Sequence, residues 1–134
     1  MPNFKNICNN EIFIEGIAGS GKTRFVECAA GYFGMPLFRL DCRKQFTREK
    51  EISLFSKALA EYFSKEHFWT IVLFDDLDYL VKNPLGSTDH SEGDANLISK
   101  VYSVVCSLKN INEAKVIFIA TSSPGILTND NFFR

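Results

Sequence analysis

Short apolar runs alternate along the chain with longer segments in which apolar residues recur every three or four positions. The short runs predict buried strands, and the longer segments predict amphipathic helices. Strands are expected at residues 12–15, 36–41, 70–75 and 115–121, and helices from Thr23, from about Thr47 and from about Asp94. This alternation favours an α/β fold with a doubly wound parallel sheet, because helices must then cover both faces.

Each helical segment carries an apolar face, which we interpret as core. On the first helix this face comprises Phe25, Val26, Ala29, Ala30 and Phe33, and Gly34 is the expected C-cap. The faces of the other two helices comprise Ile52, Phe55, Leu59 and Phe63, and then Ile98, Val101, Val105 and Leu108. Residues 82–93 are polar and rich in turn formers, so they are expected to form the one long loop.

The chain has 134 residues and a formal net charge of -1. This length is typical of one domain. The charge provides no basic field for nucleic acid or anionic lipid, and acidic residues interrupt the basic cluster within 39–50. No nucleic-acid partner is therefore expected.

The cysteines and the N-terminal segment bear on the compartment. Cys8, Cys28, Cys42 and Cys106 show no C-x-x-C spacing, so they are interpreted as free thiols in a reducing, cytoplasmic environment. Residues 1–10 lack a signal pattern, and every apolar run is far shorter than the ~20 residues that cross a bilayer. Direct membrane insertion is not expected.

The residues after the first strand fit the pattern G-x-x-x-x-G-K-[ST]. Glycines let successive N–H groups converge on phosphate oxygens at the positive end of the next helix. A Gly/Ser-rich turn is the alternative, but the flanking strand and helix favour a P-loop for ATP. Lys22 would contact the β- and γ-phosphates, and the Thr23 hydroxyl would hold Mg²⁺. The expected nucleotide-binding residues are Gly16, Ile17, Ala18, Gly19, Ser20, Gly21, Lys22 and Thr23.

A second chemical pattern is the apolar strand that ends in Asp75 and Asp76. At this distance from a P-loop, Asp75 is the expected Mg²⁺-side carboxylate. Asp76 is the expected general base that polarises the attacking water. Acidic residues at strand ends are common in α/β proteins, so the alternative for Asp76 is a solvated carboxylate at a helix start, sharing N-cap duty with Asp78.

These segments resemble the AAA ATPases, with GIAGSGKT as Walker A, IVLFDD as Walker B and VIFIATSSP as the strand of the polar sensor 1 residue. The resemblance covers about residues 12–134 and implies the P-loop NTPase (AAA+) type of sheet. It places sensor 1 at Ser122, so the expected catalytic residues are Lys22, Asp76 and Ser122. The metal-side residues are Thr23 and Asp75.

The segments LDC and LFDDLDYL resemble the first ATPase domain of the peroxisome-biogenesis AAA proteins, and next the second ATPase domain of the vesicle-fusion protein NSF. This implies a protein-remodelling module that acts on a protein client. Its partners would be the other subunits of a homo- or hetero-hexameric AAA ring. It also implies a cytoplasmic location, on the cytosolic face of an organelle membrane such as the peroxisome.

Several positions depart from the family pattern. Asp76 replaces the usual Glu and reaches about 1.5 Å less far, so slow hydrolysis is expected. Sensor 1 is usually Asn, whereas this position is Ser122, with Thr121 and Ser123 as polar neighbours that could partly substitute as water-orienting groups; a strand-end turn before Pro124 is the alternative. Residues 42–51 contain no aromatic-apolar-Gly triplet, since Phe46 is followed by Thr47 and Arg48, so polypeptide threading is not expected.

The resemblance also implies parts that the chain lacks. The family has a fifth strand beside the P-loop strand and then a helical lid, so residues 1–134 are expected to be an incomplete large AAA subdomain. Residues 12–15 would then have an open apolar edge. Arg134 lies near the position of an arginine finger that acts on the neighbouring subunit.

Three functions remain open at this point. The first is slow ATP hydrolysis in a remodelling ring. The second is an ATP-binding assembly module with little or no hydrolysis, in which nucleotide stabilises the assembled state. The third is a small P-loop kinase, although an arginine-rich lid and an acceptor-binding segment are not evident in the sequence.

Overall fold

The computed structural model describes residues 3–8, 10–17, 19–43, 48–80, 91–111 and 114–125. The elements in chain order are β1 (Asn3–Cys8), β2 (Glu11–Glu15), α1 (Lys22–Phe33), β3 (Leu37–Asp41), α2 (Arg48–Lys65), β4 (Thr70–Asp75), the 3-10 turn η1 (Leu77–Leu80), α3 (Ser91–Lys109) and β5 (Val116–Ser122). The four predicted strands and three predicted helices are confirmed. Strand β1 was not expected, and α3 begins at Ser91 rather than near Asp94, so part of the expected loop is helical.

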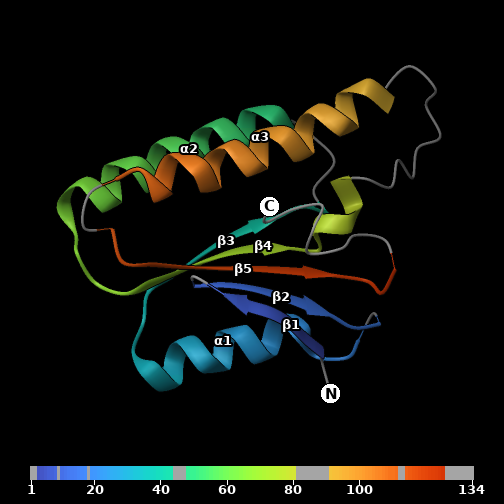
Figure 1. The fold of residues 1–134 in the computed structure, drawn as a ribbon, viewed down its shortest axis with the longest axis horizontal. Coiled ribbons are helices and arrows are strands. Elements are labelled where there is room, and N and C mark those ends of the chain that lie inside the picture. The colour runs from blue at the N-terminus through green and yellow to red at the C-terminus, as the bar shows by residue number, and fades with distance from the viewer. Residues whose placement is uncertain are drawn as a thin grey trace.

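The strands form one sheet in the order β1-β2-β5-β4-β3. Strands β2, β5, β4 and β3 are parallel to one another, and β1 pairs antiparallel with β2. Helix α1 covers one face of the sheet, and α2 and α3 lie side by side on the other (Figure 1). The doubly wound parallel sheet is therefore confirmed, and the carboxyl ends of its four parallel strands meet at one edge.

Two apolar clusters fill the space between the helices and the sheet. Neighbouring residues of a strand point to opposite faces, so Phe13 packs toward α2 and α3 while Ile14 packs toward α1. Helices α2 and α3 contribute to the larger cluster Ile52, Leu59, Phe63, Val101, Val104, Val105 and Leu108. These residues confirm most of the two predicted helix stripes; the side chain of Ile98 lies outside the described residues.

Helix α1 buries a narrower face than the sequence predicts. The buried residues are Lys22, Val26 and Ala30, which form a single i, i+4 row against the sheet. The prediction that Phe25 and Phe33 belong to the core is wrong, since they are 42% and 66% exposed. They flank the row, and among the described residues no second helix lies beside α1 on its side of the sheet (Figure 1).

The C-cap prediction for α1 is confirmed. Gly34 has φ 65°, and its N–H points back to the carbonyl groups of Ala30 and Gly31. A left-handed residue at this position favours glycine, because a Cβ atom would be strained there. The chain then turns directly into β3.

The open edge predicted for β2 is wrong, because β1 pairs with it antiparallel from Asn3↔Glu15 to Cys8↔Glu11. The chain reverses at Asn10, whose φ of 66° asparagine tolerates better than most residues. The pairing register shifts between Lys5 and Cys8. Such an irregularity breaks the period-two pattern by which strands are recognised in sequence.

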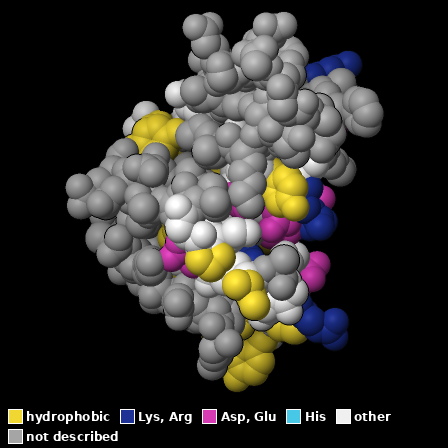
Figure 2. Space-filling model, turned by 90° about the vertical axis from the view of Figure 1, so that its right-hand side faces the viewer, with side chains coloured by type: hydrophobic (Ala, Val, Ile, Leu, Met, Phe, Trp, Pro, Cys, Tyr) yellow, Lys and Arg dark blue, Asp and Glu magenta, His cyan; other side chains and the backbone are white. Residues whose placement is uncertain are grey.

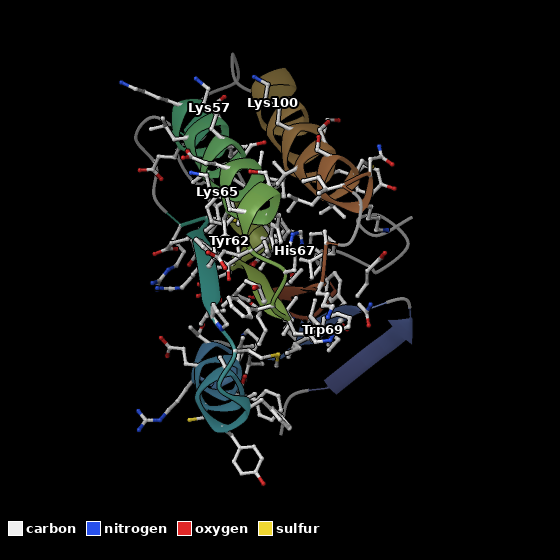
Figure 3. All side chains as sticks on the ribbon, turned by 90° about the vertical axis from the view of Figure 1, so that its left-hand side faces the viewer. Lys57, Tyr62, Lys65, His67, Trp69 and Lys100 are labelled. Atoms are coloured by element: carbon white, nitrogen blue, oxygen red, sulfur yellow. The ribbon has the colours of Figure 1, made fainter. Side chains whose placement is uncertain are left out.

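At the amino-terminal end of the parallel strands, opposite the P-loop pattern, a polar contact joins α2 to β4. The hydroxyl groups of Tyr62 on α2 and Thr70 on β4 are 3.0 Å apart, and the intervening turn carries His67 and Trp69 (Figure 3).

Cys28, Cys42 and Cys106 are free thiols. None of the helices in the described parts of the chain is long and apolar enough to span a bilayer.

Candidate functional site

The loop between β2 and α1 has the backbone shape of a phosphate cradle. Gly19 and Gly21 have φ values of 81° and 89°, which other residues adopt only with strain. A Cβ atom on Gly16 would lie 2.5 Å from Ser20 Oγ. That hydroxyl is buried and has no hydrogen-bond partner among the described residues, so it fits a ligand atom in the loop.

The loop is attached to the centre of the sheet. The Gly16 N–H donates a 3.1 Å hydrogen bond to the carbonyl of Ser122, at the end of β5. Lys22 is 7% exposed, and its Nζ donates to the carbonyls of Gly16 at 2.5 Å and Ile17 at 3.1 Å. The ammonium group therefore lies inside the loop, where it is held by the loop's own backbone. Ala18 lies outside the described residues.

Thr23 and Asp75 meet between α1 and β4. The Thr23 hydroxyl lies 2.8 Å and 2.9 Å from the two carboxylate oxygens of Asp75, to which it donates. Asp75 is fully buried. A donated proton leaves the lone pairs of the Thr23 oxygen available, and hydroxyl and carboxylate oxygens are the ligands that Mg²⁺ takes in proteins. The donor set is therefore of the kind that suits Mg²⁺, and the Mg²⁺ site stays a prediction.

Thr121 links the two acidic residues to β5. Its hydroxyl donates to Asp75 Oδ1 at 2.7 Å and accepts the N–H of Asp76 at 2.8 Å. Ser122, the predicted sensor 1 residue, is buried, and its hydroxyl donates to the adjacent Ser123 carbonyl at 2.9 Å. Of the two, Thr121 makes the contacts to the acidic pair.

Asp76 stands at a sharp turn, with φ 57°, where β4 passes into η1. Its carbonyl accepts the N–H of Tyr79, and its carboxylate lies 3.2 Å from Arg43 Nε. Burial and the neighbouring charge of Asp75 raise the pKa of Asp76, while Arg43 acts in the opposite direction. The predicted base thus faces the site from a strained turn and is held by a cation.

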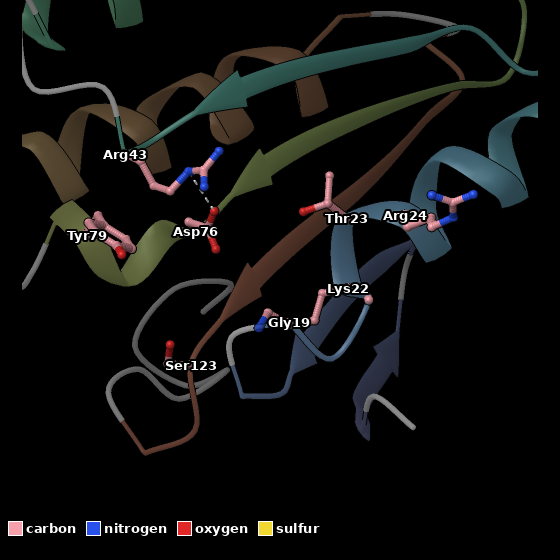
Figure 4. Close-up of a pocket in the computed structure, with 9 residues that line it drawn as sticks. Gly19, Lys22, Thr23, Arg24, Arg43, Asp76, Tyr79 and Ser123 are labelled. Carbon is pink, nitrogen blue, oxygen red and sulfur yellow. Dashed lines mark ion pairs between the residues drawn. The ribbon is translucent and has the colours of Figure 1, made fainter.

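Of these groups, Lys22, Thr23 and Asp76 line one cavity of about 280 Å³ at the carboxyl edge of the sheet, and Thr23 connects it to the buried Asp75 (Figure 4). Acidic and basic side chains lie side by side at this edge (Figure 2). The lining residues are Gly19, Gly21, Lys22, Thr23, Arg24, Arg43, Asp76, Tyr79 and Ser123. Ligands bind at this edge in open parallel sheets. Within the described residues there is no separate group of three or more His, Cys, Asp or Glu side chains that could hold a metal ion.

The family model of the ATPases associated with various cellular activities (AAA) matches residues 12–132. The chain belongs to the AAA ATPase family. The match spans the loop, the acidic strand end and β5, so the sequence-based resemblance to this family is confirmed. The finer resemblance to peroxisome-biogenesis proteins or NSF stays a prediction.

A solved structure supports the same fold for this AAA domain. The crystal structure of the FIGL-1 AAA domain in complex with ADP superposes with a TM-score of 0.62 at 16% identity, covering 89% of this chain. The chain spans 37% of the length of that structure. No curated protein matches the sequence.

The structure brings together Lys22, Thr23, Asp75 and Asp76, the residues that sequence reasoning assigned to the chemistry of the AAA domain. Ile17 lies at the loop and is 69% exposed. Arg134 and Phe46 lie outside the described residues, so the arginine finger stays a prediction and the pore-loop segment is not described.

Sequence reasoning missed two arginines of the AAA site. Arg43 lines the cavity and pairs with Asp41 and Asp76, both at 3.2 Å from its Nε. Arg39 contacts Asp75 from the middle of β3. In the sequence both belong to a mixed-charge cluster that is typical of a solvated surface. The sequence carries no signal that singles them out, because their contacts depend on the register of β3 on β4, which places Asp41 opposite Asp75.

Proposed function

We propose that this AAA domain binds Mg·ATP at the loop 16–23 and hydrolyses it slowly. The observation that carries the proposal is the convergence of Lys22, Thr23, Asp75 and Asp76 on one edge of the sheet, around one cavity. Loop cations, a hydroxyl and two carboxylates in this order are the parts that phosphoryl transfer needs. The family match supports the same reaction class.

Each of these residues has a separate role in the proposed binding and hydrolysis of ATP. Lys22 exchanges its loop carbonyls for phosphate oxygens, and the backbone N–H groups of the loop supply further donors. Thr23 and Asp75 would hold Mg²⁺, which would supply positive charge to the β- and γ-phosphates. Asp76 accepts the proton of the attacking water at its carboxylate. Thr121 fixes the relative positions of the two carboxylates.

Slow turnover follows from the position of Asp76. Its side chain is one methylene shorter than glutamate, and in this structure it pairs with Arg43. Arg43 holds the Oδ2 atom of this carboxylate, and its positive charge makes the carboxylate a weaker base. The same observation favours the second candidate function, an assembly module that holds ATP with little hydrolysis.

At the level of the cell, we propose that the domain acts as a subunit of a hexameric AAA ring that remodels a protein client. Support comes from the family match and from the LDC and LFDDLDYL segments that resemble peroxisome-biogenesis AAA proteins. The corresponding location is the cytoplasm, at the cytosolic face of the peroxisome, with a role in protein transport.

The deciding experiment measures Mg·ATP affinity and phosphate release side by side, with Lys22→Ala as the comparison. Lys22 bonds only to loop carbonyls among its described contacts, so its loss removes a phosphate ligand with little effect on the apolar core. If the unmodified chain binds Mg·ATP and releases phosphate, and Lys22→Ala does neither, the result supports hydrolysis. Lys22-dependent binding without release supports the assembly module, and Lys22-independent binding contradicts both.

A further inference from the structure

The Asp75 carboxylate already has a cation beside it, supplied by the chain itself. Arg39 donates from Nε to Asp75 Oδ2 at 2.8 Å, and the second guanidinium nitrogen of this ion pair lies 2.6 Å from the same oxygen. Asp75 is fully buried, whereas the Arg39 side chain is one-third exposed. The arginine therefore reaches from the surface into the buried site, and one carboxylate oxygen is enclosed by its guanidinium.

The strand register explains why the two side chains meet. Arg39 and Asp41 are two residues apart on β3, and Asp41 lies opposite Asp75 on β4. Residues two apart on a strand share a face, so Arg39 lies on the same face as Asp75 and close to α1. Burial acts to lower the pKa of Arg39, but the hydrogen bond and charge of Asp75 outweigh it and raise that pKa. The guanidinium is thus permanently charged.

Both oxygens of the Asp75 carboxylate already have donors. Oδ1 accepts from Thr121, Oδ2 contacts two guanidinium nitrogens of Arg39, and the Thr23 hydroxyl lies within reach of both oxygens. A divalent cation that binds either oxygen must therefore share the carboxylate with Arg39. A buried carboxylate gains a large share of its stabilisation from one well-placed cation, so two cations at one carboxylate oppose each other.

We propose that Arg39 is a specificity-determining residue of the metal site, which competes with Mg²⁺ for Asp75 and makes nucleotide binding only weakly dependent on a divalent cation. The inference rests on the proposed ATP site. When a metal displaces it, Arg39 has a second partner, since its guanidinium already lies 3.8 Å from Asp41. The exposed part of the side chain gives it room to move outward.

The test compares the affinity for a fluorescent ATP analogue in excess MgCl₂ with the affinity in EDTA. For the unmodified chain we expect Mg²⁺ to improve affinity less than about threefold, and in Arg39→Gln by about tenfold or more, because Asp75 then lacks its own cation. Arg39→Lys should lie between the two, since one ammonium replaces a bidentate fork. If the ratio of the affinity in MgCl₂ to the affinity in EDTA is the same in Arg39→Gln as in the unmodified chain, the proposal is overturned. If Arg39→Gln does not fold, an unchanged ratio in Arg39→Lys overturns it.

Arg43→Gln is the matched control. It removes an equal charge from the same edge, but the ion pairs of Arg43 are with Asp41 and Asp76. If Arg43→Gln raises the ratio of ATP-analogue affinity in MgCl₂ to that in EDTA as much as Arg39→Gln does, the effect comes from the overall charge at this edge. The proposal is then wrong. Circular dichroism and thermal unfolding establish that each variant is folded.

A titration with Mn²⁺ alone, followed by electron paramagnetic resonance, separates this inference from the proposed function. Arg39→Gln should bind Mn²⁺ about tenfold more tightly than the unmodified chain, and Asp75→Asn in the same background should abolish the gain. If ATP binding proves independent of Lys22, the proposed function fails, and the Mn²⁺ result still decides on Arg39. Equal Mn²⁺ affinity with and without Arg39 overturns the competition.

Discussion

At the residue scale, Thr121 determines the geometry of the acidic pair. Its hydroxyl donates to Asp75 and accepts from the backbone of Asp76, so one oxygen fixes both residues of the Walker B strand end. We expect Thr121→Val, which keeps the shape, to lower the free energy of unfolding by about 1–3 kcal/mol, because two buried polar groups lose a partner. Urea unfolding measures the change.

Ser122→Ala is the control for this prediction. Ser122 is equally buried, but its hydroxyl donates only to the adjacent carbonyl among its described contacts. Its loss should cost about 1 kcal/mol or less. Equal losses in the two variants would mean that the Thr121 contacts have no special weight.

The short reach of the Asp76 carboxylate is testable at the same scale. Asp76→Glu extends the carboxylate by about 1.5 Å, which brings the base nearer to a water in front of the P-loop. We expect the rate of phosphate release to rise about tenfold or more at unchanged ATP affinity. Single-turnover hydrolysis with saturating Mg·ATP measures the rate. If turnover stays constant while ATP still binds, reach does not limit the reaction and the assembly-module function gains support.

At the scale of elements, the β1–β2 hairpin depends on its turn. Asn10 has φ 66°, a conformation that glycine adopts freely and that costs alanine more than asparagine. We expect Asn10→Ala to destabilise the protein by about 1 kcal/mol and Asn10→Gly to leave stability nearly unchanged. Thermal unfolding of the two variants checks this. If both lose the same stability, the asparagine side chain rather than its backbone conformation supports the turn.

Elements differ in how well their sequence reveals them. Strand β4 is buried at all six positions, and its continuous apolar run predicts its bounds correctly. Strand β1 has the apolar residues Phe4, Ile7 and Cys8 without regular alternation, and its register shift accounts for this. For α1, periodicity identifies the helix but not how much of it a single sheet face covers.

The same distinction applies to the site. The P-loop pattern is one short continuous segment, and Asp75 and Asp76 adjoin in a second one, so the sequence alone predicts both. Arg39, Arg43 and Thr121 act through contacts to residues on other elements, so their roles depend on strand register and on a turn with positive φ. A mixed-charge segment does not show which of its charges will face a buried carboxylate.

At the scale of the whole molecule, the order of the strands in the sheet differs from their order along the chain. Strand β5 is the last to appear in sequence and yet lies between β2 and β4, where it contacts both halves of the site. The two apolar clusters on either side of the sheet both include its residues. The site is therefore a property of the assembled sheet rather than of the P-loop alone.

This order has a consequence for the newly made chain. The P-loop leaves the ribosome early, but the carbonyl of Ser122 that binds Gly16, and the Thr121 hydroxyl that binds Asp75, are synthesised much later. At ordinary rates of translation the delay for about 100 residues is roughly 5–20 s. Until β5 has been translated, β2 and, once made, β4 lack their central neighbour, so the nascent chain can gain a nucleotide-competent loop only after that point.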